Sequence, residues 1–166
     1  MLEIRPAALS EFSLLPELEA EADLRFECLV PPISASDFPA PGTAADNAQA
    51  LHIMVAGRPP RGFVRLVAID GRAHLEQLAV SLDYGRQGIG RALVHAAKAW
   101  ARESGFHEMT LSTFADVPFN GPFYASCGFV EILPEELTAG LQAVRRQEIA
   151  LGLDVAGRRI AMISAV

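Results

Sequence analysis

Leu75-Glu-Gln-Leu-Ala-Val-Ser-Leu-Asp-Tyr-Gly-Arg-Gln-Gly-Ile-Gly-Arg91 is the stretch of sequence that decides the fold of this chain. It begins as a short apolar strand that ends near Val80, passes through a polar turn, and reaches a glycine-rich turn followed by helix-forming residues. The first amides of a helix have no partner within the helix, and the helix dipole favours negative charge there. Gly88 and Gly90 have no Cβ, so an anion can come close to the backbone. The stretch therefore predicts an anion site at a strand-to-helix turn.

Two common glycine-rich loops do not match this stretch. The phosphate loop of P-loop enzymes needs Gly-Lys-Ser/Thr, a triplet that the sequence lacks. A dinucleotide-binding turn needs three glycines at fixed offsets, and an acidic residue about 20 positions later at the end of a second parallel strand. Glu108 lies near that distance, but it begins the next strand instead of ending it. The P-loop interpretation is therefore set aside, and the dinucleotide interpretation is poor.

The segment after the loop predicts a helix from about Ile89 to Ser104, which Gly105 ends. Apolar residues recur along it at helical spacing and should face a sheet: Ile89, Leu93, Ala96, Ala97 and Trp100. Glu108–Phe114 reads as a further strand. Because a helix joins this strand to the one before the loop, the two strands should be parallel.

A second motif follows that strand, in the segment Asn120-Gly-Pro-Phe-Tyr124-Ala-Ser-Cys-Gly128-Phe129. Asn120 is a suitable N-cap for a short helix, with Pro122 just inside its start. Gly128 is a suitable end for the same helix.

The two motifs, in this order, resemble the GCN5-related N-acetyltransferases (GNAT family). The first is similar to the family's acyl-CoA loop, Arg/Gln-x-x-Gly-x-Gly/Ala, with Gly88 and Gly90 at the two small positions. Gly85 stands where the family has its first Arg/Gln, and the arginine is displaced to Arg86. The second is similar to Asn-x-x-(x)-Phe-Tyr-x-x-x-Gly-Phe. The resemblance covers roughly residues 62–129.

This resemblance implies one domain over residues 1–166 with a mixed α/β (α+β) fold. The family's fold has a central, twisted, antiparallel-to-parallel sheet of about six to seven strands flanked by helices. It also has a splay between the fourth and fifth strands, where the acyl-CoA is bound.

The resemblance also implies a set of residues that bind acetyl-CoA, the co-substrate. The pantetheine arm would lie along the strand end, where a backbone amide near Leu78 or Ala79 polarises the thioester carbonyl. The pyrophosphate would lie on the loop amides. The expected binding residues are Leu78, Ala79, Val80, Arg86, Gln87, Gly88, Ile89, Gly90, Arg91, Asn120 and Phe123. For the side chains of Arg86 and Arg91, a solvated surface position is the alternative interpretation.

Two residues are predicted to act on the reacting groups. The family uses a tyrosine at the place of Tyr124 as general acid toward the departing CoA thiolate; the alternative is a packing position beside Phe123. An amine with a pKa of about 10.4 is mostly protonated, and removing its proton at pH 7 costs roughly 4–5 kcal/mol. Glu76 is the expected base, and a salt-bridged strand residue is the alternative interpretation.

Three further residues near these positions carry groups that take part in catalysis in other proteins. Asp116, just past the end of a strand, is the second choice for the base. His74 titrates in a suitable range, but an exposed histidine at the start of a strand is the preferred interpretation. No basic group lies near Cys127 in sequence, so a structural thiol is expected.

The flanking segments predict the remaining elements. Leu2–Arg5 should form a first strand, and Ser10 should cap a helix that runs to about Leu24. The segment 26–47 is rich in proline and reads as a loop with at most a short helix, either covering the acceptor or lying at the surface without function. Asp70-Gly71 predicts a tight hairpin. Further strands are expected at 51–56, 62–69, 73–80 and 159–164, and a last helix from Glu135 and Glu136 to Gly152.

Composition limits the classes of function. The 166 residues are 51% hydrophobic, but no apolar run approaches the ~20 residues of a membrane span. The N-terminus lacks a signal-peptide pattern, and two cysteines make neither a disulfide framework nor a metal cluster. A net charge of -6 argues against nucleic acid as a partner. A cytoplasmic protein without a metal or a membrane partner is expected.

Together these features predict direct transfer of an acetyl group from acetyl-CoA to a primary amine, with a small molecule as the expected acceptor. Two alternatives stay open at this stage. One is a non-catalytic acyl-CoA-binding or sensing module, and the other is acetylation of a peptide or protein amine. The identity of the amine and the formation of a homodimer are also left open by the sequence.

Overall fold

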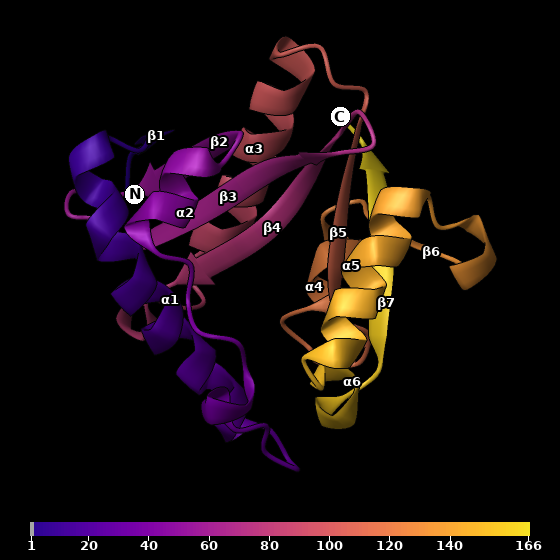
Figure 1. Cartoon of the computed structure of the whole chain (residues 1–166). Helices are drawn as coiled ribbons and strands as arrows, with labels where there is room; N and C mark the ends of the chain where they lie inside the picture. Colours follow the sequence, from indigo (N-terminus) through magenta and orange to yellow (C-terminus); the bar gives the residue numbers. More distant parts are fainter. Residues whose placement is uncertain (1) are drawn as a thin grey trace. The chain divides into compact units, whose positions relative to one another are not determined.

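The computed structural model describes residues 2–166, which form seven strands in a mixed sheet with helices (Figure 1). The strand order is β1-β2-β3-β4-β5-β7-β6, and β4 pairs with β5 in parallel. The predicted sheet of six to seven strands with a parallel pair is therefore confirmed. The strands are β1 (Ile4–Pro6), β2 (His52–Ala56), β3 (Gly62–Ile69), β4 (Arg72–Val80), β5 (Glu108–Phe114), β6 (Val130–Ile132) and β7 (Arg159–Ala165).

The helices are short except for two. They are α1 (Leu15–Asp23), α2 (Ala44–Gln49), α3 (Ile89–Glu103), α4 (Gly121–Ser126), α5 (Ala139–Ala150) and α6 (Leu153–Ala156). The chain divides into two compact units. The first comprises residues up to Val67 together with Glu76–Ala97, and the second comprises Ala68–Leu75 together with Lys98–Val166.

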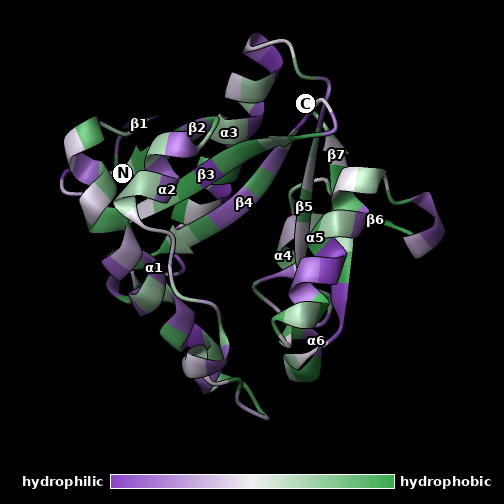
Figure 2. Ribbon diagram, viewed as in Figure 1, coloured by the Kyte–Doolittle hydropathy of each residue, from purple (hydrophilic) through white to green (hydrophobic). Residues whose placement is uncertain are grey.

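The core of the first unit lies between α1 and the strands β2 and β3. Val55 of β2 pairs with Phe63 of β3 in antiparallel register, and both side chains are fully buried. Leu15 and Leu18, three residues apart on one face of α1, pack into the same cluster. Figure 2 shows β3 as a hydrophobic strand beside the mixed surface of α1. Each such buried side chain stabilises the fold by about 1.5–3 kcal/mol.

The start of the first helical segment differs from the prediction. Ser10, the predicted N-cap, lies inside a 3₁₀ turn over Leu9–Leu14. The carboxylate of Glu11 instead accepts hydrogen bonds from the Ala8 amide at 2.8 Å and from the Arg5 guanidinium at 2.6 Å. The Arg5 hydrogen bond is the main reason that the pKa of Glu11 falls to about 2. The turn therefore begins after Ala8, whose amide is bound by the Glu11 carboxylate from the third position of the turn, and Ser10 lies too far along to cap it.

The segment between α1 and β2 has little regular structure, as predicted. It contains 3₁₀ turns over Leu24–Cys28 and Ala35–Asp37 before α2 begins. Thr43 caps α2, and its hydroxyl accepts from the Asp46 amide at 3.1 Å.

The second unit is built on β5. All seven residues of β5 pair with β7 in antiparallel register, from Glu108 opposite Ala165 to Phe114 opposite Arg159. Its first half pairs with β4 in parallel, with Ala73 beside Met109. The edge strand β6 was not predicted from the sequence. Its three residues, Val130–Ile132, are mostly exposed and too few to show an alternating pattern.

The predicted hairpin at Asp70-Gly71 is present and has a second use. Both residues have positive φ, 53° for Asp70 and 75° for Gly71, as a tight two-residue hairpin requires. The Asp70 carboxylate accepts hydrogen bonds from the Gly140 amide at 2.9 Å and from the Thr138 hydroxyl. This cap explains why α5 starts at Ala139 and not at the predicted glutamates, which form a separate 3₁₀ turn.

Among residues 2–166, no helix is both long enough and apolar enough to cross a bilayer.

Candidate functional site

The glycine-rich loop forms the predicted strand-to-helix turn. After β4, a 3₁₀ turn over Leu82–Tyr84 leads to Arg86 and Gly88, which both take left-handed backbone conformations, with φ of 59° and 80°. The Ala92 amide donates to the Gly88 carbonyl at 3.0 Å, so α3 begins at once. The first amides of α3 therefore have no carbonyl one turn earlier to bind. A loop of this shape can receive an anion.

The entry to this loop is held by α1. The Glu21 carboxylate accepts hydrogen bonds from the Ser81 hydroxyl at 2.8 Å and from the Leu82 amide at 2.9 Å. The Ser81 amide in turn donates to the Arg61 carbonyl at 2.8 Å. These contacts fix the point at which the chain leaves β4.

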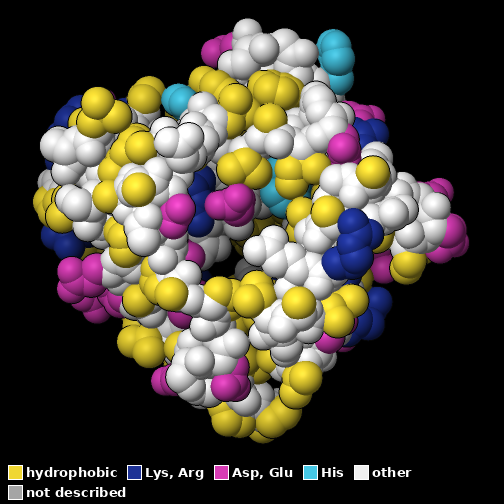
Figure 3. Space-filling view, in the orientation of Figure 1, with side chains coloured by type: hydrophobic (Ala, Val, Ile, Leu, Met, Phe, Trp, Pro, Cys, Tyr) yellow, Lys and Arg dark blue, Asp and Glu magenta, His cyan; other side chains and the backbone are white. Residues whose placement is uncertain are grey.

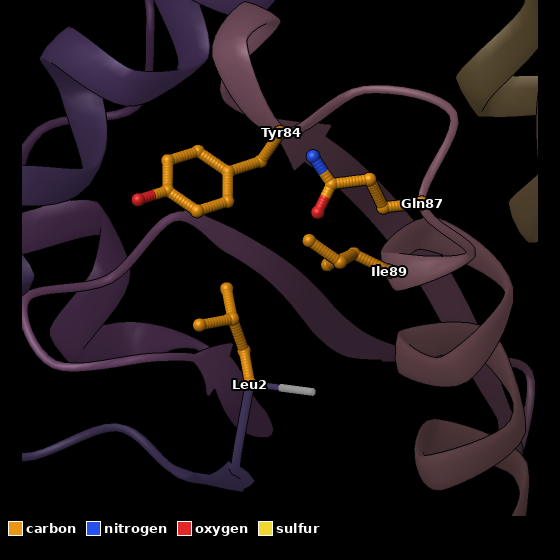
Figure 4. A pocket seen from close by; sticks show the side chains of 4 residues that line it. All are labelled: Leu2, Tyr84, Gln87 and Ile89. Atoms are coloured by element: carbon orange, nitrogen blue, oxygen red, sulfur yellow. The ribbon is translucent and has the colours of Figure 1, made fainter.

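The predicted loop residues differ in how far their side chains are exposed. The side chains of Arg86, Gln87 and Arg91 are exposed, whereas Ile89 is only 4% exposed. Ile89 can therefore offer a ligand its amide but little of its side chain. A cavity of about 310 Å³ lies beside the loop, and Figure 4 shows the Gln87 carboxamide next to the Tyr84 ring. The cavity is lined by Leu2, Tyr84, Gln87 and Ile89.

The predicted pantetheine strand is packed closely against its neighbours. Ala79 and Val80 are buried, and Leu78 is half-buried. A Cβ on Gly62 of β3 would lie 3.1 Å from the Ala79 carbonyl oxygen, so only glycine fits there without a shift. The side chains of Leu78–Val80 are apolar, so only the backbone of this segment has polar groups that can bind a ligand.

Glu76 forms a cross-strand ion pair with β3. Its Oε1 accepts from Arg65 Nε at 2.9 Å, and its side chain is 46% exposed. Glu76 is therefore a salt-bridged strand residue, which was the alternative interpretation of its sequence position. The Arg65 guanidinium also donates from Nη1 to Asn47 Oδ1 at 2.8 Å. The Arg65 side chain is 7% exposed.

Two acidic residues that the sequence analysis missed belong to the same region of the first unit. Glu19 of α1 is 9% exposed, and its Oε2 lies 3.8 Å from Arg65 Nη1. Burial raises the pKa of Glu19. Burial and the neighbouring Glu19 raise the pKa of Asp23, which follows one helical turn later, to about 6. A signal existed in the sequence, because Glu19 falls on the apolar face that Leu15 and Leu18 define.

Tyr124 lies in the second unit and is almost completely buried. Its ring packs edge-on against Phe123 at 5.1 Å and Phe129 at 5.9 Å between centroids. Burial, and to a smaller extent the nearby Cys127, raise the pKa of the Tyr124 hydroxyl above its ordinary value. Tyr124 therefore keeps its proton at neutral pH and has an O–H group that can donate a hydrogen bond.

Asn120 occupies the predicted N-cap position of α4, but its side chain does not cap the helix. Its Nδ2 donates to the Phe119 carbonyl at 3.0 Å, while its own carbonyl accepts from the Tyr124 amide at 2.9 Å. A Cβ on Gly121 would lie 2.3 Å from the Ala115 carbonyl oxygen. The end of β5 and the start of α4 therefore approach so closely that position 121 requires glycine.

The other three residues weighed for catalysis have different environments. Asp116 is 80% exposed and lies 3.7 Å from Arg158. His74 is not the exposed histidine that was predicted: it is 4% exposed, and its Nδ1 is 2.8 Å from the Thr110 hydroxyl. Its place on a strand with pairing on both sides explains this burial. Cys127 is buried, and its carbonyl accepts from Lys98 Nζ at 2.6 Å.

Charged side chains of both signs are interspersed on the face that Figure 3 shows, with Lys and Arg in small separate groups. Acidic residues outnumber basic ones by 20 to 14. No continuous basic stripe is seen on the face that Figure 3 shows.

A model of the acetyltransferase (GNAT) family matches residues 17–129, which is more than half of the chain. The chain therefore belongs to the GNAT family. The match includes the glycine-rich loop, Glu76 and the Tyr124 segment.

Relatives and solved structures agree with this family. Streptothricin acetyltransferase A of Bacillus subtilis (strain 168) is 39% identical over 62 residues, 37% of this chain and 35% of that protein. The chain thus matches about a third of the length of this relative. A GNAT acetyltransferase from Staphylococcus aureus has a TM-score of 0.72 at 16% identity, with 99% of both chains covered. The PaiA N-acetyltransferase of Thermoplasma acidophilum, solved with coenzyme A, has a TM-score of 0.68 at 15% identity and covers 100% and 99%.

Proposed function

We propose that this protein transfers the acetyl group of acetyl-CoA directly to a primary amine of a small molecule, in a ternary complex. The observation that carries the proposal is the loop before α3. Its left-handed residues Arg86 and Gly88 lead straight into a helix whose first amides need acceptors, in a chain of the GNAT family.

The pyrophosphate of acetyl-CoA would bind the loop amides from Arg86 to Gly90. The exposed side chains of Arg86 and Arg91 would add positive charge to this site. Asn120 and Phe123 are proposed to contact the co-substrate from the second motif.

The pantetheine arm would lie along Leu78–Val80 of β4, in the splay that the family has after this strand. A backbone amide of Leu78 or Ala79 would donate to the thioester carbonyl. A donor placed where an oxyanion develops contributes about 3–4 kcal/mol to the transition state.

The amine would attack the thioester carbon after losing a proton toward Glu76, directly or through water. The Arg65 pair holds the Glu76 carboxylate in one orientation while leaving it 46% exposed. The C–N bond forms as the nitrogen lone pair adds to the carbonyl and gives the tetrahedral intermediate, and the C–S bond breaks when this intermediate collapses. The departing thiolate takes the electron pair and a hydrogen bond or proton from the Tyr124 hydroxyl.

The raised pKa of Tyr124 indicates how its hydroxyl would act. A thiol has a pKa of about 8.5, so complete proton transfer from a less acidic phenol is uphill. Tyr124 would therefore stabilise the thiolate mainly through a hydrogen bond, and the proton on sulfur can follow from water.

A small-molecule acceptor is supported by the 62-residue match to a streptothricin acetyltransferase. A peptide or protein amine and a non-catalytic acyl-CoA-binding module are the competing functions.

The test is release of free CoA from acetyl-CoA in the presence of a panel of small amines and peptides. We expect turnover with at least one small amine. Turnover with peptides alone would favour the protein acceptor, and CoA binding without any turnover would favour the binding module.

The loop itself is tested by Gly90→Glu, which places a carboxylate where the pyrophosphate should bind. CoA binding measured by calorimetry should be abolished. His95→Glu adds the same charge at an exposed position of α3 one turn further along, and it should bind CoA normally. Equal affinity in Gly90→Glu and the parent protein would defeat this placement.

A further inference from the structure

The short helix α4, which carries Tyr124, ends in a complete C-terminal cap. The Tyr124 carbonyl accepts from the Phe129 amide at 3.1 Å, and the Ala125 carbonyl accepts from the Gly128 amide at 3.0 Å. Gly128 has a φ of 95°, and the ring centroids of Tyr124 and Phe129 are 5.9 Å apart. Two such hydrogen bonds, a left-handed glycine and an apolar contact define a Schellman motif. The motif joins Tyr124 to Phe129, but the later carbonyls of the helix end still need donors from elsewhere.

Lys98, in the last part of α3, supplies a donor to this helix end and lies in the same compact unit. Its Nζ donates to the Cys127 carbonyl at 2.6 Å and to the Ser164 hydroxyl of β7 at 2.7 Å. A cation at the C-terminal end of a helix is also favoured by the helix dipole. Lys98 therefore ties the end of α4 to the sheet through β7.

The ammonium of Lys98 also contacts the apolar side of the cap. Nζ lies 4.5 Å from the centre of the Phe129 ring, within the range of an attractive cation–π interaction. It would lie 3.4 Å from a Cβ on Gly128, which is the distance of ordinary contact. The Phe129 ring is 2% exposed, and the Tyr124 ring meets it at an interplanar angle of 76°. One side chain thus contacts both parts of the motif that hold Tyr124, the backbone turn and the aromatic pair.

The helix α4 depends on such contacts because it is too short to be stable alone. It has six residues, whereas isolated helices below ~12–15 residues are marginal in water. At its other end the Asn120 side chain does not cap the helix. Burial lowers the pKa of Lys98, so its ammonium is held here at a cost that the two oxygen acceptors offset. The position of α4, and with it that of the Tyr124 ring, therefore depends on Lys98.

We infer that Lys98 is a positioning residue for Tyr124, because its contacts with Cys127 and Phe129 fix the place of the Tyr124 hydroxyl. This inference rests on the proposed function, in which that hydroxyl stabilises the departing thiolate. The hydroxyl is at the far end of the ring, so a small rotation of α4 moves it more than it moves the helix axis. A displacement of about 1 Å in a group that serves the reaction can cost roughly 10²-fold in rate.

The first test is the effect of Lys98→Met, which keeps the length of the side chain and removes the ammonium. In this variant kcat should fall by about 10-fold, because the hydroxyl is held less firmly in place. The KM for acetyl-CoA should stay within about 2-fold, since the hydroxyl acts only as the thiolate develops. Arg102→Met removes a cation from an exposed position one turn later in α3, and this matched control should keep the parental kcat.

The second test separates positioning from a merely structural role. In a Tyr124→Phe background the hydroxyl is absent, so Lys98→Met should then change kcat by less than about 2-fold. A further loss of about 10-fold in this background would overturn the inference, and so would an unchanged kcat in Lys98→Met alone. If circular dichroism shows that Lys98→Met is unfolded, Ser164→Ala takes its place, because it removes one oxygen partner of Lys98. A loss of kcat in Ser164→Ala that disappears in the Tyr124→Phe background supports the inference, and no loss or a persistent loss overturns it.

Hydrogen exchange measured by mass spectrometry tests the same contacts without turnover. In Lys98→Met the amides of residues 120–129 should exchange about 10-fold faster, whereas those of α5 should exchange at the parental rate. Equal rates in the variant and the parent, or a uniform increase in both segments, would overturn the inference. If no amine is acetylated, the proposed function fails, and this measurement still decides whether Lys98 holds α4.

Discussion

Two buried glutamates, one in each compact unit, have pKa values that are shifted in opposite directions. Glu148 of α5 is 6% exposed and accepts hydrogen bonds from Ser112, Arg145 and Arg159 at distances between 2.5 and 3.2 Å. Burial acts to raise the pKa of Glu148, but the two arginines and the serine together hold it below its ordinary value. Glu19 of α1 is 9% exposed, and burial raises its pKa although Arg65, the Gly42 amide and the Gln77 side chain act to lower it.

The difference separates a carboxylate whose two oxygens are both paired from one that keeps an unpaired oxygen. Around Glu148 every strong acceptor position is used, and the network ties α5 to β5 and β7. Around Glu19, Oε2 accepts no hydrogen bond within residues 2–166, and the charges of Glu76 and Asp23 act against those of Arg65.

The largest effect is expected from Glu148→Ala, which leaves Arg145 and Arg159 without their shared partner. Breaking one side of a buried ion pair costs about 3–5 kcal/mol. For a chain of this size the melting temperature should fall by roughly 10 °C. Glu17→Ala, at an exposed position, should change it by less than about 2 °C. Thermal unfolding followed by circular dichroism measures both melting temperatures. An equal loss in the two variants would show that the hydrogen bonds of Glu148 do not stabilise the fold.

Tyr124→Phe tests whether the buried hydroxyl of Tyr124, in the second unit, stabilises the departing CoA thiolate. The ring contacts with Phe123 and Phe129 are kept, and only the hydroxyl is removed. Because a CoA thiolate is already a tolerable leaving group, kcat should fall by roughly 10²-fold, near the low end of the general-acid range. The KM for acetyl-CoA should move little, since the hydroxyl acts as the thiolate develops. Steady-state kinetics decide this, and an undiminished kcat in a folded variant would make Tyr124 a packing residue.

Glu76→Gln removes the negative charge of Glu76 and keeps its contact with β3, because the amide oxygen can still accept from Arg65. If Glu76 takes the proton of the amine, kcat/KM at pH 7 should fall by roughly 10-fold, with water left as the acceptor. Raising the pH should recover part of the loss, because more of the amine is then unprotonated. A pH–rate profile that matches the parent's would leave Glu76 as an ion-pair residue only.

Most of the fold could be predicted because its central elements carry strong local signals. The amphipathic pattern of α3, the continuous apolar run of β3 and the hairpin at Asp70-Gly71 agree with the structure within one or two residues. The failures have nonlocal causes. Ser10 is displaced as a cap by Glu11, which a strand arginine holds in place, and α5 is capped by Asp70 from 70 residues away.

The candidate site divides in the same way. The glycine-rich loop is a local feature, and its turn into α3 follows from the order of its residues. The cluster around Arg65 draws on α1, β3 and β4, and no short sequence pattern announces it. The burial of His74 likewise depends on strands that flank it on both sides.

The smallest expected effect, from Asp23→Asn, tests the comparison through pH. The folded protein keeps the Asp23 proton up to a pKa of about 6, whereas the unfolded chain loses it near the ordinary value of 3.8. Between these values the folded state binds more protons, so this group makes the free energy of unfolding fall as the pH rises from about 4 to 6. Because the carboxylate is partly exposed, solvent screening reduces the effect to on the order of 1 kcal/mol. Asp23→Asn should therefore melt about 2–4 °C higher than the parent at pH 7, with little difference at pH 4. Melting curves from pH 4 to 8 measure this, with Glu17→Gln as the control that should track the parent. A constant difference across the whole range would show that the charge of Asp23 is not the cause.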